Sequence, residues 1–330
     1  MFEFNKIDSD VAIVPTLEDK ISNDTCWCCT FNLVWNDMKN TLVKGDIVFN
    51  PEIEIVKNLN KESFKENMLS NEYYYKIYGP KTLELKKQIE NEIKKKFNQK
   101  SDILDYISWD KNNLDSSIKR YFFYTMLYRK FEYKNKFDIL KNDYFGKYKN
   151  IKYFGISANA NEEVRNQIEV LFYDNENEFA IKLITKTNDE VIFYKKPNGN
   201  TFKEVYEYMI EKSKKYLGNR CFEENDKFKA PIIELDVLKE FAELENKPFR
   251  AYDGNEIIIE NAIQTIKFAL DEKGGTIKSE ATIGIKMMSL IHEEFRKFEV
   301  NDTFVIFVKE IDKEKPYLAL KINDITKFQK

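Results

Sequence analysis

Four cysteines and one histidine are the side chains best suited to covalent or metal chemistry. Cys26, Cys28 and Cys29 lie close together, whereas Cys221 and His292 are distant from them in the sequence. A structural zinc site needs paired Cys or His ligands, and a cysteine nucleophile needs a base that is itself oriented. A Cys–His pair using His292 stays open as an alternative, but the spacing favours free thiols, no metal, no cofactor and no disulfide framework.

A second pattern lies between Asp271 and Ser289, where residues alternate with a period of two after paired glycines. One side of the alternation is apolar or small, and comprises Ile277, Ser279, Ala281, Ile283, Ile285 and Met287. The other side carries polar residues or glycine. This period is typical of a strand with one buried face, but Gly274, Gly275 and the small residues also suit a mobile loop. Both a permanent strand and a loop able to become one are consistent with the sequence.

Asp271-Glu272-Lys273-Gly274, followed by small residues, resembles the hinge of the serpins, a family that includes protease inhibitors. The resemblance implies that five residues form the hinge, namely Glu272, Lys273, Gly274, Gly275 and Thr276. Counting fourteen residues on from Gly274 reaches Met288, so it also implies a reactive bond between Met288 and Ser289. After insertion of the loop into a sheet, the residues facing the core would be Ile277, Ser279, Ala281, Ile283 and Ile285, with Lys278 and Glu280 outside.

The resemblance extends over residues 85–330. A helix at 87–107 is similar to the serpin helix over the large sheet, and residues 121–137 look like its long central strand. It implies an α+β fold with one large central β-sheet, smaller sheets, several surrounding helices and an exposed reactive-centre loop. We expect a single domain over residues 1–330, with a shortened, divergent part at 1–80 and the hinge and loop at 271–298. The chain departs from the family at Tyr133, where serpins have a tryptophan, and at Thr125, where they have an asparagine.

The composition is that of a globular protein. The chain has 330 residues, 42% of them hydrophobic and 33% charged, and a formal net charge of -3, which gives no general attraction to nucleic acid. No segment approaches the about 20 apolar residues that span a bilayer. The first residues lack the basic and apolar pattern of a signal peptide, so we expect a cytoplasmic protein as given, or an extracellular one if a leader was removed. We expect a monomer that contacts neither nucleic acid nor membrane.

Periodicity predicts the elements around the hinge. We expect helices at residues 81–100 and 201–217, the latter capped by Thr201, and a helix from Asp236 to Leu244. We expect a central strand at 121–133 and further strands, at 168–172, 179–184, 191–194, 228–233, 256–270, 304–308 and 317–322. Residues 25–38 are apolar, and their periodicity does not choose between a helix and a strand.

Two functions follow as hypotheses. In the first, the protein is a suicide inhibitor of a serine or cysteine protease that accepts Met288. In the second, it is a serpin-fold binding or interaction protein that does not inhibit, because Lys278 and Glu280 replace the small residues of inhibitory hinges. An enzyme is not expected, because the sequence shows no acid–base, metal or phosphate-binding constellation.

Overall fold

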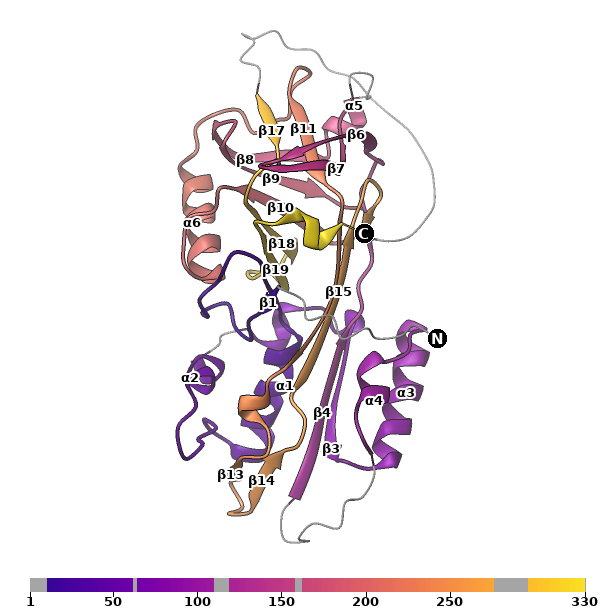
Figure 1. The fold of residues 1–330 in the computed structure, drawn as a ribbon, viewed down its shortest axis with the longest axis vertical. Coiled ribbons are helices and arrows are strands. Elements are labelled where there is room, and N and C mark those ends of the chain that lie inside the picture. Colours follow the sequence, from indigo (N-terminus) through magenta and orange to yellow (C-terminus); the bar gives the residue numbers. More distant parts are fainter. Residues whose placement is uncertain (1–10, 62–63, 110–118, 158–161, 276–295, 330) are drawn as a thin grey trace. The chain divides into compact units, whose positions relative to one another are not determined.

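The computed structural model describes residues 11–61, 64–109, 119–157, 162–275 and 296–329 (Figure 1). Contacts within the chain group these residues into two compact units. The first unit contains Cys28–Arg129 and Val237–Ile266, and the second contains Asp8–Trp27, Lys130–Asp236 and Lys267–Lys330. Each unit is therefore built from segments that are far apart in the sequence.

The first unit holds a four-stranded sheet in the order β13-β14-β4-β3. Its strands are β13 (Pro248–Arg250), β14 (Glu256–Ile259), β4 (Lys119–Leu127) and β3 (Tyr74–Pro80). Its helices are α1 (Thr30–Met38), α2 (Glu54–Lys61), α3 (Leu83–Phe97) and α4 (Asp102–Tyr106). The predicted helix at 81–100 is confirmed as α3, which begins where the Thr82 hydroxyl accepts a hydrogen bond from the Leu85 amide.

Strand β4 presents its two faces to different helices. Phe122 and Tyr124 pack with the buried stripe of α3, whereas Phe123 and Thr125 lie on the side of α1. Figure 1 shows α3 and α4 on one side of β3 and β4, and α1 on the other. The predicted strand at 121–133 is confirmed in part: β4 is an interior strand with both faces covered, but it ends at Leu127, and after residues 128–130 a separate short strand, β5 (Phe131–Glu132), follows.

The second unit is built on a seven-stranded mixed sheet in the order β1-β2-β19-β18-β10-β9-β8. Its strands are β1 (Ala12–Ile13), β2 (Thr25–Cys28), β19 (Leu318–Ile322), β18 (Phe304–Glu310), β10 (Asp189–Lys195), β9 (Glu178–Ile184) and β8 (Ile168–Asn175). Helix α6 (Phe202–Lys215), capped by Thr201 as predicted, packs the rings of Phe202 and Tyr206 on Phe307 of β18.

A second sheet of this unit has the order β17-β11-β7-β6. Its strands are β17 (Lys297–Glu299), β11 (Lys227–Pro231), β7 (Tyr148–Gly155) and β6 (Asp138–Phe145), and the short helix α5 (Glu162–Arg165) follows β7. A third, two-stranded pairing joins β5 (Phe131–Glu132) to β16 (Gly274–Gly275). The predicted α+β fold class, with a large sheet and smaller ones, is confirmed.

Strands β12 (Ile233–Glu240) and β15 (Ile263–Leu270) pair with each other, and each continues from one unit into the other along the chain. The prediction of a helix from Asp236 to Leu244 is wrong, because Ile233, Leu235 and Val237 are buried at every second position and continue β12. Only Ala242–Leu244 form a turn of 3-10 helix. Residues 25–38 are a strand followed by a helix, β2 and then α1.

Within the described ranges, no helix is both long enough and apolar enough to cross a membrane. The same residues include no group of three or more His, Cys, Asp or Glu side chains placed to hold a metal ion. All four cysteines are free; Cys26, Cys28 and Cys29 are buried and Cys221 is exposed.

Candidate functional site

The described residues flank the segment that the sequence singled out. Residues 276–295 lie outside the described ranges, and they include Thr276, Met288, Ser289 and the predicted inserting face, which is Ile277, Ser279, Ala281, Ile283 and Ile285. Residues 271–275, which precede this segment, are called the proximal anchor, and residues 296–299, which follow it, the distal anchor. Both anchors belong to the second unit.

The proximal anchor reverses the chain at the end of β15. The backbone amides of Asp271 and Gly274 each donate to the other residue's carbonyl, at 3.1 and 3.4 Å, and the Asp271 carboxylate accepts from the Lys273 amide at 2.8 Å. This two-residue turn is the tightest common connection between antiparallel strands. The chain that leaves it therefore runs antiparallel to β15.

Beyond the turn, the proximal anchor is already paired as a strand. Gly274 lies opposite Glu132 and Gly275 opposite Phe131 in the antiparallel pairing of β16 with β5. The carbonyl of Lys273 accepts from the Tyr133 amide at 3.0 Å, and that of Glu272 accepts from the Phe137 amide at 2.9 Å. The structure thus brings four predicted hinge residues, Glu272 to Gly275, onto one segment of chain.

Gly274 is required at its position for two reasons. Its φ is +125°, in a region that side-chain-bearing residues rarely adopt. A Cβ atom there would also lie 2.5 Å from the Phe131 carbonyl oxygen and 2.7 Å from the Glu132 Cα. The absence of a side chain therefore permits β16 to approach β5.

Two buried side chains lie beside the proximal anchor. Tyr133 is 2% exposed and packs edge-on against Phe137 with ring centroids 4.9 Å apart. Its hydroxyl has no hydrogen-bond partner among the described residues, and burial, with a smaller contribution from Asp271, raises its pKa well above the ordinary value. Glu272 is also buried and forms ion pairs with Lys136 and Lys273, at 3.5 and 3.6 Å.

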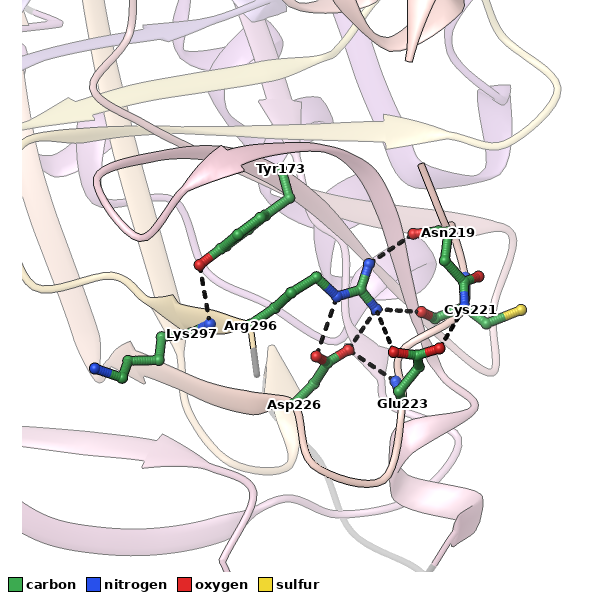
Figure 2. Close-up of polar contacts among 7 residues, drawn as sticks. All are labelled: Tyr173, Asn219, Cys221, Glu223, Asp226, Arg296 and Lys297. Carbon is green, nitrogen blue, oxygen red and sulfur yellow. Dashed lines mark hydrogen bonds and ion pairs between the residues drawn. The ribbon is translucent and has the colours of Figure 1, made fainter. Parts of the chain in front are cut away.

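The distal anchor is held by a buried ion pair (Figure 2). Arg296 bonds the Asp226 carboxylate through Nε at 3.1 Å and Nη2 at 2.5 Å, a two-pronged geometry. Its remaining bonds go to the carbonyls of Asn219 and Cys221, both at 2.7 Å. Burial opposes the charged guanidinium, but the hydrogen bonds that it donates to the Asp226 carboxylate outweigh the burial, so the Arg296 pKa is raised.

Strand β17 forms the rest of the distal anchor and joins it to the sheet. Lys297, Phe298 and Glu299 pair in parallel with residues 227–229 of β11, and the Lys297 amide donates to the Tyr173 hydroxyl at 3.2 Å. Phe298 is fully buried against the rings of Tyr173 and Phe179. Sequence reasoning missed the contact between Arg296 and Asp226, since 70 positions separate them.

In the first unit, β4 has an open edge. It pairs with β3 from Tyr121 to Leu127, but with β14 only as far as Tyr121 opposite Ile259. Past this point, the described strands include none paired to that edge. A cavity of about 50 Å³ lies there, lined by Phe123 and Thr125 of β4, by Ala262 and by Gln264 of β15, with Phe31 and Trp35 of α1 beneath.

Gln264 connects β15 to the start of α1. Its side-chain amide donates to the Cys28 carbonyl at 3.0 Å and to the Thr30 hydroxyl at 2.8 Å. Its Oε1 and the Thr125 Oγ1 are both buried and unbonded within the described structure. The first unit thus has an open strand edge, and the second unit has a paired strand start and a firmly held end on either side of residues 276–295.

Comparison with known proteins was made for sequence and structure. No protein-family model and no curated protein matches the sequence. Among solved structures, Serpin48 of the insect Tenebrio molitor is 10% identical with a TM-score of 0.50, covering 92% of both chains. A thyroxine-binding globulin complex is 11% identical with a TM-score of 0.48, covering 91% of this chain and 92% of that one. The agreement with Serpin48 spans nearly the whole length of both proteins, and the chain therefore has the serpin fold.

Proposed function

We propose that this protein is a serpin-like protease inhibitor that acts as a suicide substrate. A serine or cysteine protease would attack the Met288 carbonyl, form an acyl-enzyme and release Ser289 as a new amino terminus. Residues 276–287 would then enter the sheet at the open edge of β4. The observation that carries this proposal is the pairing of β16 with β5, which starts such a strand in the required direction.

Two registers support the proposed insertion. Counted on without an insertion through residues 128–130, which lie between β4 and β5, the β16–β5 pairing would set Ala281 opposite Thr125 and Ile283 opposite Phe123. Continued from the turn at Asp271 and Gly274, the pairing with β15 sets Ala281 opposite Gln264 and Ile283 opposite Ala262. The four described partners, which are Phe123, Thr125, Ala262 and Gln264, all line the cavity of about 50 Å³. Both registers would therefore place Ala281 and Ile283 at this cavity.

The same registers would also determine the faces of the inserted strand. Five side chains of the inserted strand would point to the same face of the sheet as Phe123 and Thr125, whose side chains face α1. They are Ile277, Ser279, Ala281, Ile283 and Ile285. Lys278 and Glu280 would fall on the opposite face, so no charge would enter the core. About ten to fifteen new backbone hydrogen bonds, each worth about 0.5 to 1.5 kcal/mol, would contribute on the order of 10 kcal/mol. Each buried isoleucine would add about 1.5 to 3 kcal/mol.

The first experiment mixes the protein with chymotrypsin-like, elastase-like and subtilisin-like proteases. We expect an SDS-stable complex with a protease that cuts after Met288, and a large rise in the melting temperature of the protein once the loop is cut. Met288→Asp should abolish both, because it removes the preferred residue without touching either anchor. Cleavage after Met288 with no complex for every protease, and an unchanged melting temperature, would remove the proposal.

A second candidate is a non-inhibitory binding protein, favoured by a cavity of about 610 Å³ in the second unit. It lies beside α6 and is lined by Tyr206 and Ile210 of the helix and by charged Lys182, Glu190 and Lys309 of the large sheet. Its volume falls within the range of small-molecule sites. Under this function, cutting the loop should leave the melting temperature unchanged. An amphipathic dye such as anilinonaphthalene sulfonate should bind to the parent protein, and this binding should be lost in Ile210→Glu.

A further inference from the structure

We propose that residues 216–222, which connect α6 to β11, form a docking surface for the protease that cuts the chain after Met288, with Leu217 as the contact residue. These residues are called the docking loop. The inference rests on the proposed function, because it adds a second place where the same protease would bind. The whole docking loop belongs to the second unit, as do both anchors.

Leu217 is the most exposed large apolar residue of the described structure. It is 99% exposed, whereas the other exposed residues of this kind are between 37% and 69% exposed. A single apolar residue at a surface is common and by itself indicates no function. Burying a whole leucine side chain on binding, however, is worth about a 10- to 100-fold gain in affinity. The conformation of the loop therefore decides whether this side chain can serve as a contact.

Arg220 holds the chain that leads to Leu217. Its guanidinium donates to the Tyr216 carbonyl at 3.4 Å and to the Leu171 carbonyl of β8 at 3.1 Å. Arginine presents its donors in a planar fork, so these bonds fix the direction of the chain as well as its position. On the other side of Leu217, a Cβ atom on Gly218 would collide with the Tyr216 hydroxyl. The leucine thus projects from a turn that folds closely on itself.

Arg296 holds the second half of the docking loop. Its guanidinium donates to the carbonyls of Asn219 and Cys221, both at 2.7 Å (Figure 2). Arg296 is also the first described residue after the 276–295 segment. The docking loop and the end of that segment are therefore bonded into one block. A preorganised loop loses little conformational freedom on binding, and this favours affinity.

The length of the chain identifies the partner. Ser289 and Arg296 are seven positions apart, and an extended chain spans at most about 3.6 Å per residue, so the two lie within about 25 Å of each other. A protease–inhibitor interface buries about 800 Å² on each partner, an area about 30 Å across. The protease bound at Met288 is thus tethered beside the docking loop. A second copy of the chain or a lipid surface has no such tether.

The rate of cutting tests the contact. The protease is whichever of the chymotrypsin-like, elastase-like and subtilisin-like enzymes cuts the parent protein fastest after Met288. Leu217→Ser should lower kcat/KM for this cut by at least about tenfold. Ile311→Ser is the matched control and should leave it unchanged, because Ile311 is 48% exposed and follows the end of β18 that lies away from β17. Equal rates for Leu217→Ser and the parent would overturn the docking surface.

A second variant tests the loop rather than the side chain. Arg220→Lys keeps the charge but loses the planar fork, so it should slow the cut by about threefold or more with Leu217 still present. An unchanged rate would overturn the positioning role of Arg220.

Two binding measurements on the parent test the other occupants. A dimer on a sizing column that becomes a monomer in Leu217→Ser would assign the loop to a second copy of the chain and overturn the protease. Binding to phosphatidylcholine–phosphatidylserine vesicles that is lost in Leu217→Ser would assign it to a lipid surface, with the same consequence. We expect neither.

The docking surface and the proposed inhibition fail separately, because the rate of cutting and the fate of the cut protein are read from one reaction. An SDS-stable complex that forms equally fast with Leu217→Ser would support inhibition and overturn the docking surface. Slower cutting of Leu217→Ser, with no complex for either protein, would support the docking surface and overturn inhibition.

Discussion

The two anchors of the 276–295 segment are built in opposite ways. The proximal anchor is held by backbone hydrogen bonds, and its key residue, Gly274, has no side chain. The distal anchor is held by side chains, with the Arg296 guanidinium bonded four times in a buried pocket. Both ends belong to the same unit, yet one depends on the absence of a side chain and the other on a large charged one.

The two kinds of bonding differ in how easily each could be extended along the chain. A backbone ladder can grow by one residue at a time, since every residue offers the same donor and acceptor. A buried ion pair cannot shift without leaving a charge unpaired. The proposed inhibition requires the proximal anchor to lengthen into a strand while the distal anchor keeps its place, and the two kinds of bonding are consistent with these two roles.

The largest effect should come from Arg296→Met. The substitution leaves the Asp226 carboxylate buried without a counter-ion, which costs about 3 to 5 kcal/mol of unfolding free energy. Lys297→Met is the matched control, because the Lys297 side chain is 43% exposed and its pair with Glu176 should be worth about 1 kcal/mol or less. Urea unfolding measures both. Equal losses in the two variants would mean that the distal anchor does not depend on the buried pair.

Ile283→Ala should reduce the stability of the cut form by about 2 to 5 kcal/mol, because this side chain would fill the cavity between Phe123 and Ala262. Its neighbour Thr282 would face the other way, so Thr282→Ala should change the same quantity by about 0.5 kcal/mol or less. The measurement is the melting temperature after cutting, compared with that of the intact chain. The reverse pattern would show that the strand enters one residue out of register.

Gly274→Ala should cost about 1 to 3 kcal/mol in the intact protein, because the new Cβ meets the Phe131 carbonyl and the positive φ becomes strained. Gly45→Ala serves as the control, since its Cβ would meet nothing within 4 Å. Thermal unfolding of both variants, alongside the rate of complex formation, tests whether the proximal anchor needs close contact with β5. A Gly274→Ala protein that matches Gly45→Ala in both measurements would contradict this view.

The smallest effect should come from Tyr133→Phe, within about 1 kcal/mol and towards higher stability, because the lost hydroxyl is buried without a bond to any described residue. Tyr153→Phe is the contrast, since that hydroxyl donates to the Tyr144 carbonyl at 2.8 Å and its loss should destabilise. The raised pKa of Tyr133 favours the neutral phenol in the folded state. Stability should therefore fall as pH rises above about 10, less steeply in Tyr133→Phe.

Local periodicity was enough to predict much of the fold. Leu85, Ile89 and Ile93 form a buried stripe, and α3 lies where they predict it. The helix predicted from Asp236 is wrong because aspartate often caps helices, whereas the alternation of Leu235 and Val237 was the stronger signal and indicated strand β12. Segment 25–38 could not be assigned, since both of its elements are buried and apolar along most of their length.

The site was predictable only in part. The two acidic residues and the two glycines of the proximal anchor all lie within residues 271–275, so the sequence pattern is recognisable, and the structure pairs Gly274 and Gly275 with β5. The folded chain brings Arg296 into contact with Asp226, and Gln264 into contact with Thr30. Neither contact can be predicted from local spacing in the sequence. The reactive bond at Met288 and Ser289 stays a prediction.

The position of the distal anchor has a consequence for purification. Residues 289–330, the piece that follows the proposed cut, contain β17, β18 and β19, and β18 lies between β10 and β19 in the interior of the seven-stranded sheet. With Arg296 also bonded in place, the nicked protein should elute from a native sizing column as one particle. The short carboxy-terminal peptide should separate only in denaturant, so mass spectrometry under denaturing conditions is the way to find the cut.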